Sequence, residues 1–493
     1  MKKNFIYLIF LAIIILLQFN INYYSKSVTI SPDSIRFMSF WQNNYDLYHN
    51  NLIKFIYHSL KDSIKYDYNR ARITQYLLYG IDVIIRKGGV NYDTNYIMLF
   101  LMYLNSFLVS IYFTKNIKIE SEKILIFILT IGICCSSIYF YSSILVVILY
   151  AKHVWITFIL LYFISKIKII QYSSLLFASF SDELGLISSL IIIFLIVYSY
   201  LQEHNFSLKK SLFVSFSIIS ILFLAFFGFS AIVFNLGSGF ASMSINFGAE
   251  NIRISFFEKI ASISEIFTNI ILGSNLFLND NSRIFIKILL ILIISIVLII
   301  IIVKQNFLKI IYNFKYNLIN PSFINKNLFL YFTFSIFIII NFIILPGGGN
   351  DFGHRGYARY ISILLLFLSI LFSFISISKI KYILFFIFCI HFLVFTFSKD
   401  NQYNFNNKML NVFIVDSSIS IDDLNKINIS RDEFVNTGKS NTFNEINNNE
   451  LIDLSGTWYY SKIKNFDTTK GSYFPVKGTL EVMIWPKKIT NIK

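Results

Sequence analysis

Ionisable residues are nearly absent from the long apolar stretches of this 493-residue chain. Apart from Lys152, His153 and His391, those stretches carry almost no charge. A transporter needs polar groups along a path through the membrane, and these groups lie within its spans. Internal repeats, which are typical of many transporters, are not visible either. The scarcity argues against transport and favours chemistry carried out by the loops.

Cysteine is also rare, and its placement excludes a disulfide framework. The three cysteines, Cys134, Cys135 and Cys389, all lie within apolar runs, so packing alone is expected to hold the loops together. No spacing of histidine and cysteine is typical of a zinc site. The alternating pattern of membrane barrel strands is missing too, which leaves helices as the only means of spanning a bilayer.

Hydrophobic residues, in contrast, are abundant. They form 56% of the chain, and the mean hydropathy of +0.63 predicts an all-α polytopic membrane protein. The first apolar run ends without a small-residue cleavage site, so we expect it to be retained as a helix. Eleven spans are predicted, at 4–23, 95–114, 123–140, 145–165, 169–181, 184–201, 211–235, 283–303, 327–345, 358–376 and 380–398.

Lysines predict the orientation of these spans in a bacterial inner membrane. With a cytoplasmic N-terminus, every short inner loop becomes basic, as the positive-inside rule requires. The net charge of +16 therefore orients spans, and nucleic acid is not expected as a partner. The lysines concerned are Lys115, Lys118, Lys123, Lys166, Lys168, Lys209, Lys210, Lys304, Lys309, Lys315, Lys326, Lys379 and Lys381.

Two domains are predicted: a transmembrane domain over 1–398 and an extracytoplasmic tail over 399–493, with alternating residues that favour a small β-containing fold. Within the first outer loop, 24–94, apolar residues recur at helical spacing and predict an amphipathic helix in the membrane interface; they are Ile73, Leu77, Ile81 and Ile84. The stretch 252–272 fits either a second interfacial helix or a loop helix packed on protein.

The fourth span poses a conflict. If its helix begins at 145, Lys152 and His153 lie near the middle of the bilayer, where an unpaired lysine is costly. A short third helix followed by a re-entrant piece over 137–151 would instead raise both residues, together with Trp155, towards the outer face. Both interpretations stay open at this point.

Asp33 is the candidate catalytic residue. It lies about ten residues beyond the first span, after Pro32, which restricts the backbone and favours a fixed carboxylate at the membrane surface. A carboxylate there fits a general base, because transfer from a phosphate leaving group needs no acid. A loop aspartate that caps the next helix is the simpler alternative.

Two further groups of charged residues belong to the outer side. Arg70 and Arg72 precede the interfacial helix, and their guanidinium groups match phosphate oxygens or reach lipid head groups. Asp182 and Glu183 follow Ser181 between two spans. Ser181 fits a helix cap with the acids stabilised by the helix dipole; the functional alternative is an acidic site for acceptor hydroxyls or a divalent cation.

The loop 346–357 and the start of the next span carry the densest group of candidate ligands. Three consecutive glycines from Gly347 allow the backbone to approach a ligand closely. His354, Arg355 and Arg359 add positive charge at the head of the tenth span. A flexible turn with interfacial anchors is the alternative.

Together these features resemble the GT-C superfamily of polytopic glycosyltransferases, which includes the protein O-mannosyltransferases and the aminoarabinose transferases of lipid A. Asp33 matches the early acidic position of the first outer loop, although Ser34 follows it where an acid–acid pair is common. The segments 70–79, 105–108, 178–183 and 354–360 are similar to the interfacial helix, second span, Ser-x-Glu step and late arginine–tyrosine segment. The resemblance covers about residues 1–398.

The resemblance implies an inverting transfer of a sugar from a polyprenyl-phosphate donor to a glycan, lipid or protein acceptor in the cell envelope. Asp33 would be the base, and Asp182 and Glu183 would line the acceptor side. The donor phosphate would be bound by Arg70, Arg72, Lys152, His354, Arg355 and Arg359. Competing interpretations are an O-antigen polymerase or ligase, a lipid-linked saccharide flippase, and a non-catalytic membrane protein whose tail recruits partners.

Overall fold

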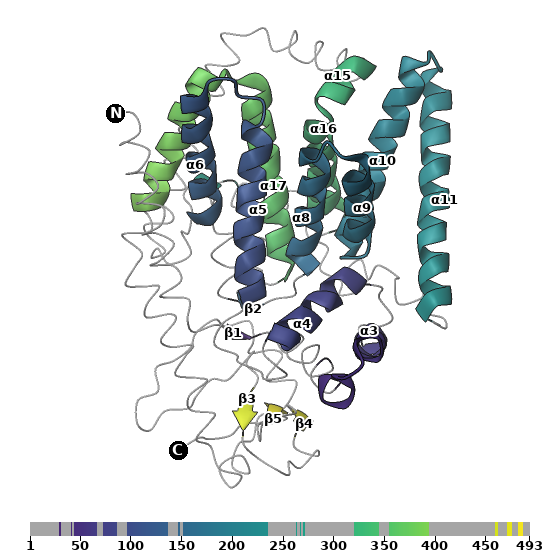
Figure 1. The fold of residues 1–493 in the computed structure, drawn as a ribbon. Coiled ribbons are helices and arrows are strands. Elements are labelled where there is room, and N and C mark those ends of the chain that lie inside the picture. Colours follow the sequence, from purple (N-terminus) through teal and green to yellow (C-terminus); the bar gives the residue numbers. More distant parts are fainter. Residues whose placement is uncertain are drawn as a thin grey trace.

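A computed structural model describes about half of the chain, most of it helical (Figure 1). The described residues are 29–30, 41, 44–66, 72–85, 96–136, 146–147, 151–234, 263, 267, 270–271, 320–344, 354–393, 459–461, 471–475 and 482–486. The predicted spans 4–23 and 283–303 lie outside these ranges.

An upright bundle of apolar helices forms the body of the molecule (Figure 1). Within it α5 packs against α6 and α8, α9 against α8 and α10, and α16 against α17. Its members are α5 (Tyr96–Thr114), α6 (Glu120–Ser136), α8 (Ala151–Ile164), α9 (Lys168–Ser179), α10 (Glu183–Glu203), α11 (Leu208–Phe234), α15 (Pro321–Lys326), α16 (Leu328–Ile338) with its π-helical continuation η3 (Ile339–Ile344), α17 (His354–Phe374) and the helical residues 377–393.

Short turns make successive helices antiparallel, so their connections alternate between two ends of the bundle. The turns that join α5 to α6, α8 to α9 and α10 to α11 lie at the upper end in Figure 1, and each has lysines within it or in the first turn of the helix that follows. The lower end carries the predicted outer segments. The described helices therefore match the expected order and direction of the spans.

The number of membrane crossings stays a prediction. Among the described residues, only α10 and the segment Leu208–Phe226 of α11 are long and apolar enough by themselves to cross a membrane. Several others, including Phe100–Thr114 and Tyr360–Phe374, are apolar but shorter. The described part of the predicted transmembrane domain is mostly helical, as expected, with one short pair of strands besides.

The expected start of the fourth span at 145 is wrong. Residues Val146–Val147 form a short strand, β2, which pairs in parallel with β1 (Thr29–Ile30), and helix α8 begins only at Ala151. Lys152 and His153 consequently lie in the first turn of α8, at the end of the bundle that faces α4. This is the position that the re-entrant alternative required.

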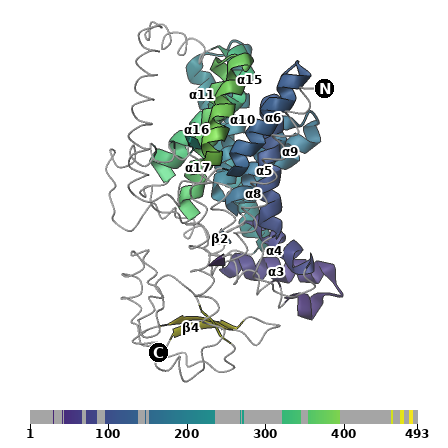
Figure 2. The same cartoon turned by 90° about the vertical axis from the view of Figure 1, so that its left-hand side faces the viewer.

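Two helices of the first loop, α3 (Leu52–Tyr66) and α4 (Ile73–Ile85), lie across the lower end of the bundle (Figures 1 and 2). The predicted amphipathic helix is thus confirmed as a helix. Its predicted apolar stripe is divided: Ile81 and Ile84 are exposed, whereas Ile73 and Leu77 are half-buried against the core. The buried residues include the polar Gln75, Tyr79 and Asp82.

The described residues of the 252–272 stretch favour a helix packed on protein. Ile270 is fully buried, and the ring of Phe267 contacts that of Phe367 on α17, with their centroids 5.6 Å apart. The carbonyl oxygen of Ile270 lies 2.8 Å from Nε2 of His391, a hydrogen bond that ties the segment to the last helix. His391 is buried.

In the tail, three strands form an antiparallel sheet in the order β3-β5-β4. They are β3 (Tyr459–Ser461), β4 (Gly471–Pro475) and β5 (Val482–Pro486). β3 and β5 overlap the alternating segments at 456–460 and 480–485, whereas β4 was not predicted. A separate extracytoplasmic domain stays a prediction.

Candidate functional site

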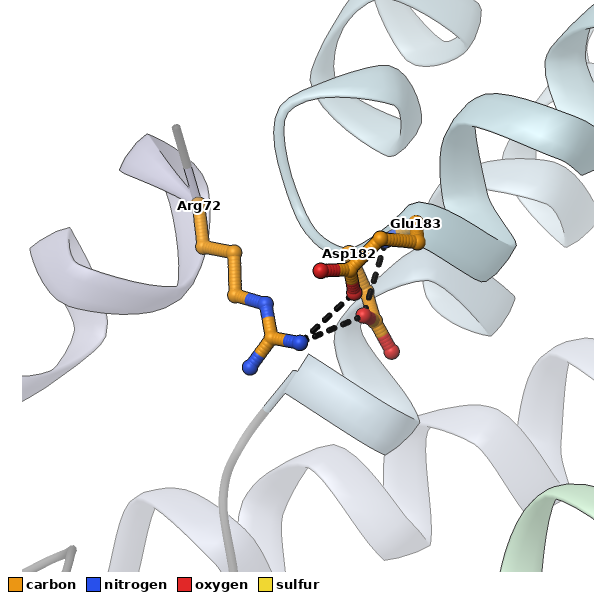
Figure 3. Close-up of polar contacts among 3 residues, drawn as sticks. All are labelled: Arg72, Asp182 and Glu183. Atoms are coloured by element: carbon orange, nitrogen blue, oxygen red, sulfur yellow. Dashed lines mark hydrogen bonds and ion pairs between the residues drawn. The ribbon is translucent and has the colours of Figure 1, made fainter. Parts of the chain in front are cut away.

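Three of the predicted site residues converge at the end of the bundle that α4 crosses: Arg72, Asp182 and Glu183 (Figure 3). Asp33 and Arg70 lie outside the described residues. Lys152 lies in the first turn of α8, and three others occupy the first two turns of α17: His354, Arg355 and Arg359. For these four the structure describes the helical backbone only.

Arg72 immediately precedes α4 and reaches the head of α10. One of its guanidinium nitrogens, Nη2, lies 2.6 Å from Oε2 of Glu183 and 3.3 Å from Oδ1 of Asp182. Figure 3 shows all three side chains turned towards one another from the two elements. A charge-assisted hydrogen bond of the shorter length is among the strong ones in proteins, so the cluster attaches the first loop to the bundle.

Asp182, and not Ser181, is the N-cap of α10. Its backbone is extended (φ −165°, ψ 165°), and its carboxylate accepts a hydrogen bond of 2.8 Å from the backbone N–H of Glu183. Ser181 instead donates its hydroxyl to the carbonyl oxygen of Phe177, at 2.7 Å. The expected serine cap is therefore wrong, because the short aspartate side chain already satisfies a first-turn N–H.

Helix α4 is also joined to the end of α9 through hydrogen bonds of Thr74. Its backbone N–H donates to the carbonyl of Phe180 at 3.0 Å, and its hydroxyl donates to the carbonyl of Phe177 at 3.0 Å. The last carbonyls of a helix have no partner within it, so a residue that binds two carbonyls at this end fixes the approach of α4. This places Arg72 within reach of the α10 head.

The cluster combines one cation with two anions in different surroundings. The Arg72 and Asp182 side chains are 9% and 0% exposed, whereas Glu183 is 41% exposed. A buried carboxylate needs compensation, and here the guanidinium and the positive end of α10 both supply it. Glu183 keeps part of its surface free of protein, so it is the member best placed to meet another molecule.

The inward side of α4 continues the cluster along one stripe. Arg72, Gln75, Tyr79 and Asp82 follow one another at spacings of three or four residues, which puts them on one face of a helix. All four are buried. The helical spacing of these four residues is visible in the sequence. It did not predict a site, because an amphipathic helix is expected to turn its polar side to water.

A second polar group anchors the start of α8 to α5. The Asn105 amide donates to the carbonyl of His153 at 3.1 Å, and Thr157 donates its hydroxyl to the Asn105 side-chain oxygen at 2.6 Å. His153 and Asn105 are buried. These bonds hold the turn that carries Lys152 and His153. Thr157 was not among the predicted site residues.

The described residues contain no group of three or more histidine, cysteine, aspartate or glutamate side chains that could hold a metal ion. Asp182 and Glu183 supply two carboxylates, both engaged by Arg72. A divalent cation at this position stays a prediction.

No known protein family, curated protein or solved structure is significantly similar to this chain.

Proposed function

We propose that this protein is an inverting glycosyltransferase, which moves a sugar from a polyprenyl-phosphate donor to an acceptor of the cell envelope at the outer face of the inner membrane. The observation that supports it is the Arg72–Asp182–Glu183 cluster, which joins the first loop to the bundle at the end opposite the lysine-bearing turns. Charged groups gathered at one membrane surface fit a reaction in which a lipid donor meets a polar acceptor.

In the proposed reaction, an acceptor hydroxyl oxygen attacks the anomeric carbon of the sugar from the face opposite the phosphate. A bond forms between that oxygen and the carbon, and the bond from the carbon to the phosphate oxygen breaks. The hydroxyl proton passes to the carboxylate of Asp33, and polyprenyl phosphate leaves with the electron pair. Because phosphate is a good leaving group, a single base is sufficient.

The charges of the cluster support a division of roles. Two carboxylates and one guanidinium carry a net negative charge, which would repel the donor phosphate. We therefore assign Arg72 to positioning α4, in place of the phosphate contact implied by the resemblance. Glu183 and Asp182 belong to the acceptor side. The donor phosphate is assigned to Arg70, Lys152, His354, Arg355 and Arg359.

The test uses the full-length protein in proteoliposomes, with a hexose-bearing polyprenyl phosphate as donor and a cell-envelope extract as acceptor. Release of free polyprenyl phosphate, measured by mass spectrometry, reports transfer without knowledge of the acceptor. Asp33→Asn is expected to lower the rate about 100-fold or more, because it removes the general base.

Lys381→Gln provides a matched control. Lys381 forms an ion pair of 3.0 Å with Glu122 at the opposite end of the bundle, so its loss should leave the rate unchanged. Unaltered transfer by Asp33→Asn would remove the mechanism. Failure of the unmodified protein to release polyprenyl phosphate, with each of several hexoses as the sugar, would count against the function itself.

A further inference from the structure

Gln75 is completely buried and makes no hydrogen bond with any of the described residues. It lies on the inward stripe of α4, one turn beyond Arg72, and its side chain has no exposed surface. Within the part of the chain that the structure describes, neither the amide nitrogen nor the amide oxygen makes a hydrogen bond. An amide with two donors and an acceptor is thus held in the protein with all of its hydrogen-bonding capacity unused.

Such an arrangement is costly, because a buried polar group without a partner loses its hydration and gains nothing in return. Leucine at this position would fill a similar volume without that cost. Unsatisfied buried groups in native proteins therefore call for a reason, and a role in ligand binding is one.

Two other unpaired donors lie around the same end of the bundle. The indole N–H groups of Trp41 and Trp155 are buried, and neither makes a hydrogen bond with the described residues. Trp41 packs on Gly80 of α4, and Trp155 lies beside Gly185 in the first turn of α10. Because α4 contacts α8, Trp155 lies on the helix that faces α4, whereas Trp41 lies between α4 and α3, where its ring meets that of Phe55.

We propose that Gln75 is a specificity residue that hydrogen-bonds hydroxyl groups of the saccharide, in a site between α4 and the outer ends of α8 and α10. The inference rests on the proposed function, which supplies a sugar as the ligand. An amide can donate to one hydroxyl and accept from its neighbour, and indole N–H groups add donors with an apolar ring face. Because Gln75 has no exposed surface here, the sugar reaches it only when α4 moves.

Thermal unfolding of the purified full-length protein in nanodiscs tests this proposal. The probes are polyprenyl phosphate alone and polyprenyl phosphate carrying glucose, mannose or galactose. For the unmodified protein, at least one glycosylated lipid should raise the midpoint further than the bare lipid does. Gln75→Leu should abolish that difference, with Kd for the glycosylated lipid about tenfold to a hundredfold higher. The midpoint of the ligand-free variant should not fall.

Tyr331→Phe is the matched control. It removes a buried polar group on α16, a hydroxyl that likewise lacks a partner among the described residues. It should keep the sugar-dependent difference. If Gln75→Leu also keeps it, or if no sugar adds to the effect of the bare lipid, the proposal is overturned while the proposed function stands. If neither lipid stabilises the unmodified protein, both fail.

Discussion

Arg72 joins the first loop to the bundle through its charge. Its guanidinium is 9% exposed and serves two carboxylates that differ in burial, with Asp182 covered and Glu183 partly open. Removing a cation from a buried carboxylate leaves an uncompensated charge, whereas an open carboxylate is still hydrated. The pair with Asp182 should therefore contribute more to the free energy of unfolding than the pair with Glu183 does.

Arg72→Met should destabilise the protein by about 3 kcal/mol or more, because it removes the cation beside the buried carboxylate of Asp182 and leaves only part of its compensation. Glu183→Gln should cost under about 1 kcal/mol, since the side chain is 41% exposed and its pair is screened by water. Unfolding midpoints in detergent measure both. Equal losses would show that burial of Asp182 does not govern the cluster.

Substitution of Asp182 separates its cap from its charge. Asp182→Ala loses the 2.8 Å bond to the N–H of Glu183 as well as the contact with Arg72, and should cost about 1–2 kcal/mol. Asp182→Asn keeps an oxygen that can cap the helix, so it should lose less. If the asparagine variant is as unstable as the alanine variant in the same unfolding assay, the cap contributes nothing.

At the scale of elements, the turn between α9 and α10 decides where the acidic residues lie. Gly185 sits in the first turn of α10 against α9 and α8. A Cβ at this position would lie 2.0 Å from the carbonyl oxygen of Ala178 and 2.8 Å from the Cβ of Trp155. Backbone cannot yield as a flexible side chain can, so only glycine allows this close approach of the helices.

Gly185→Ala should therefore force α10 away from α9, lower the unfolding midpoint and disturb the Arg72 cluster. Gly228→Ala in α11 is the matched substitution, because a Cβ there meets nothing within 4 Å. It should leave the midpoint unchanged or raise it, since alanine favours a helix more than glycine does. Similar midpoints for the two variants would refute the steric argument.

At the scale of the whole molecule, the two ends of the bundle differ in charge and in structure. One end holds the lysine-bearing turns and the other holds α3, α4 and the Arg72 cluster (Figure 1). Because antiparallel helices with short turns alternate between two ends, one labelled position at each end is sufficient to determine which side of the membrane each end faces.

Single cysteines test this topology. Lys65→Cys on α3 should react with a membrane-impermeant maleimide in intact cells, and Lys166→Cys, between α8 and α9, should react only after the cells are opened. Both lysines are exposed, and the native cysteines are buried or half-buried, so their background reaction should be weak. Labelling of both positions from the same side would reject the orientation.

The sequence by itself determined the order of the described helices, because long apolar runs separated by short polar turns favour helices that pack side by side. It also marked Arg72, Asp182 and Glu183 as candidates from their position in outer loops. The sequence did not predict where α8 begins, because the same apolar run is compatible with a helix and with the strand that pairs with β1.

Only the tertiary structure decided that Arg72 meets two carboxylates more than a hundred residues away, because no periodicity connects such distant positions. It also decided which side of α4 turns inward. Helical periodicity groups the residues of each face but does not say which face meets the bundle; packing buried Gln75, Tyr79 and Asp82 and left Ile81 and Ile84 exposed.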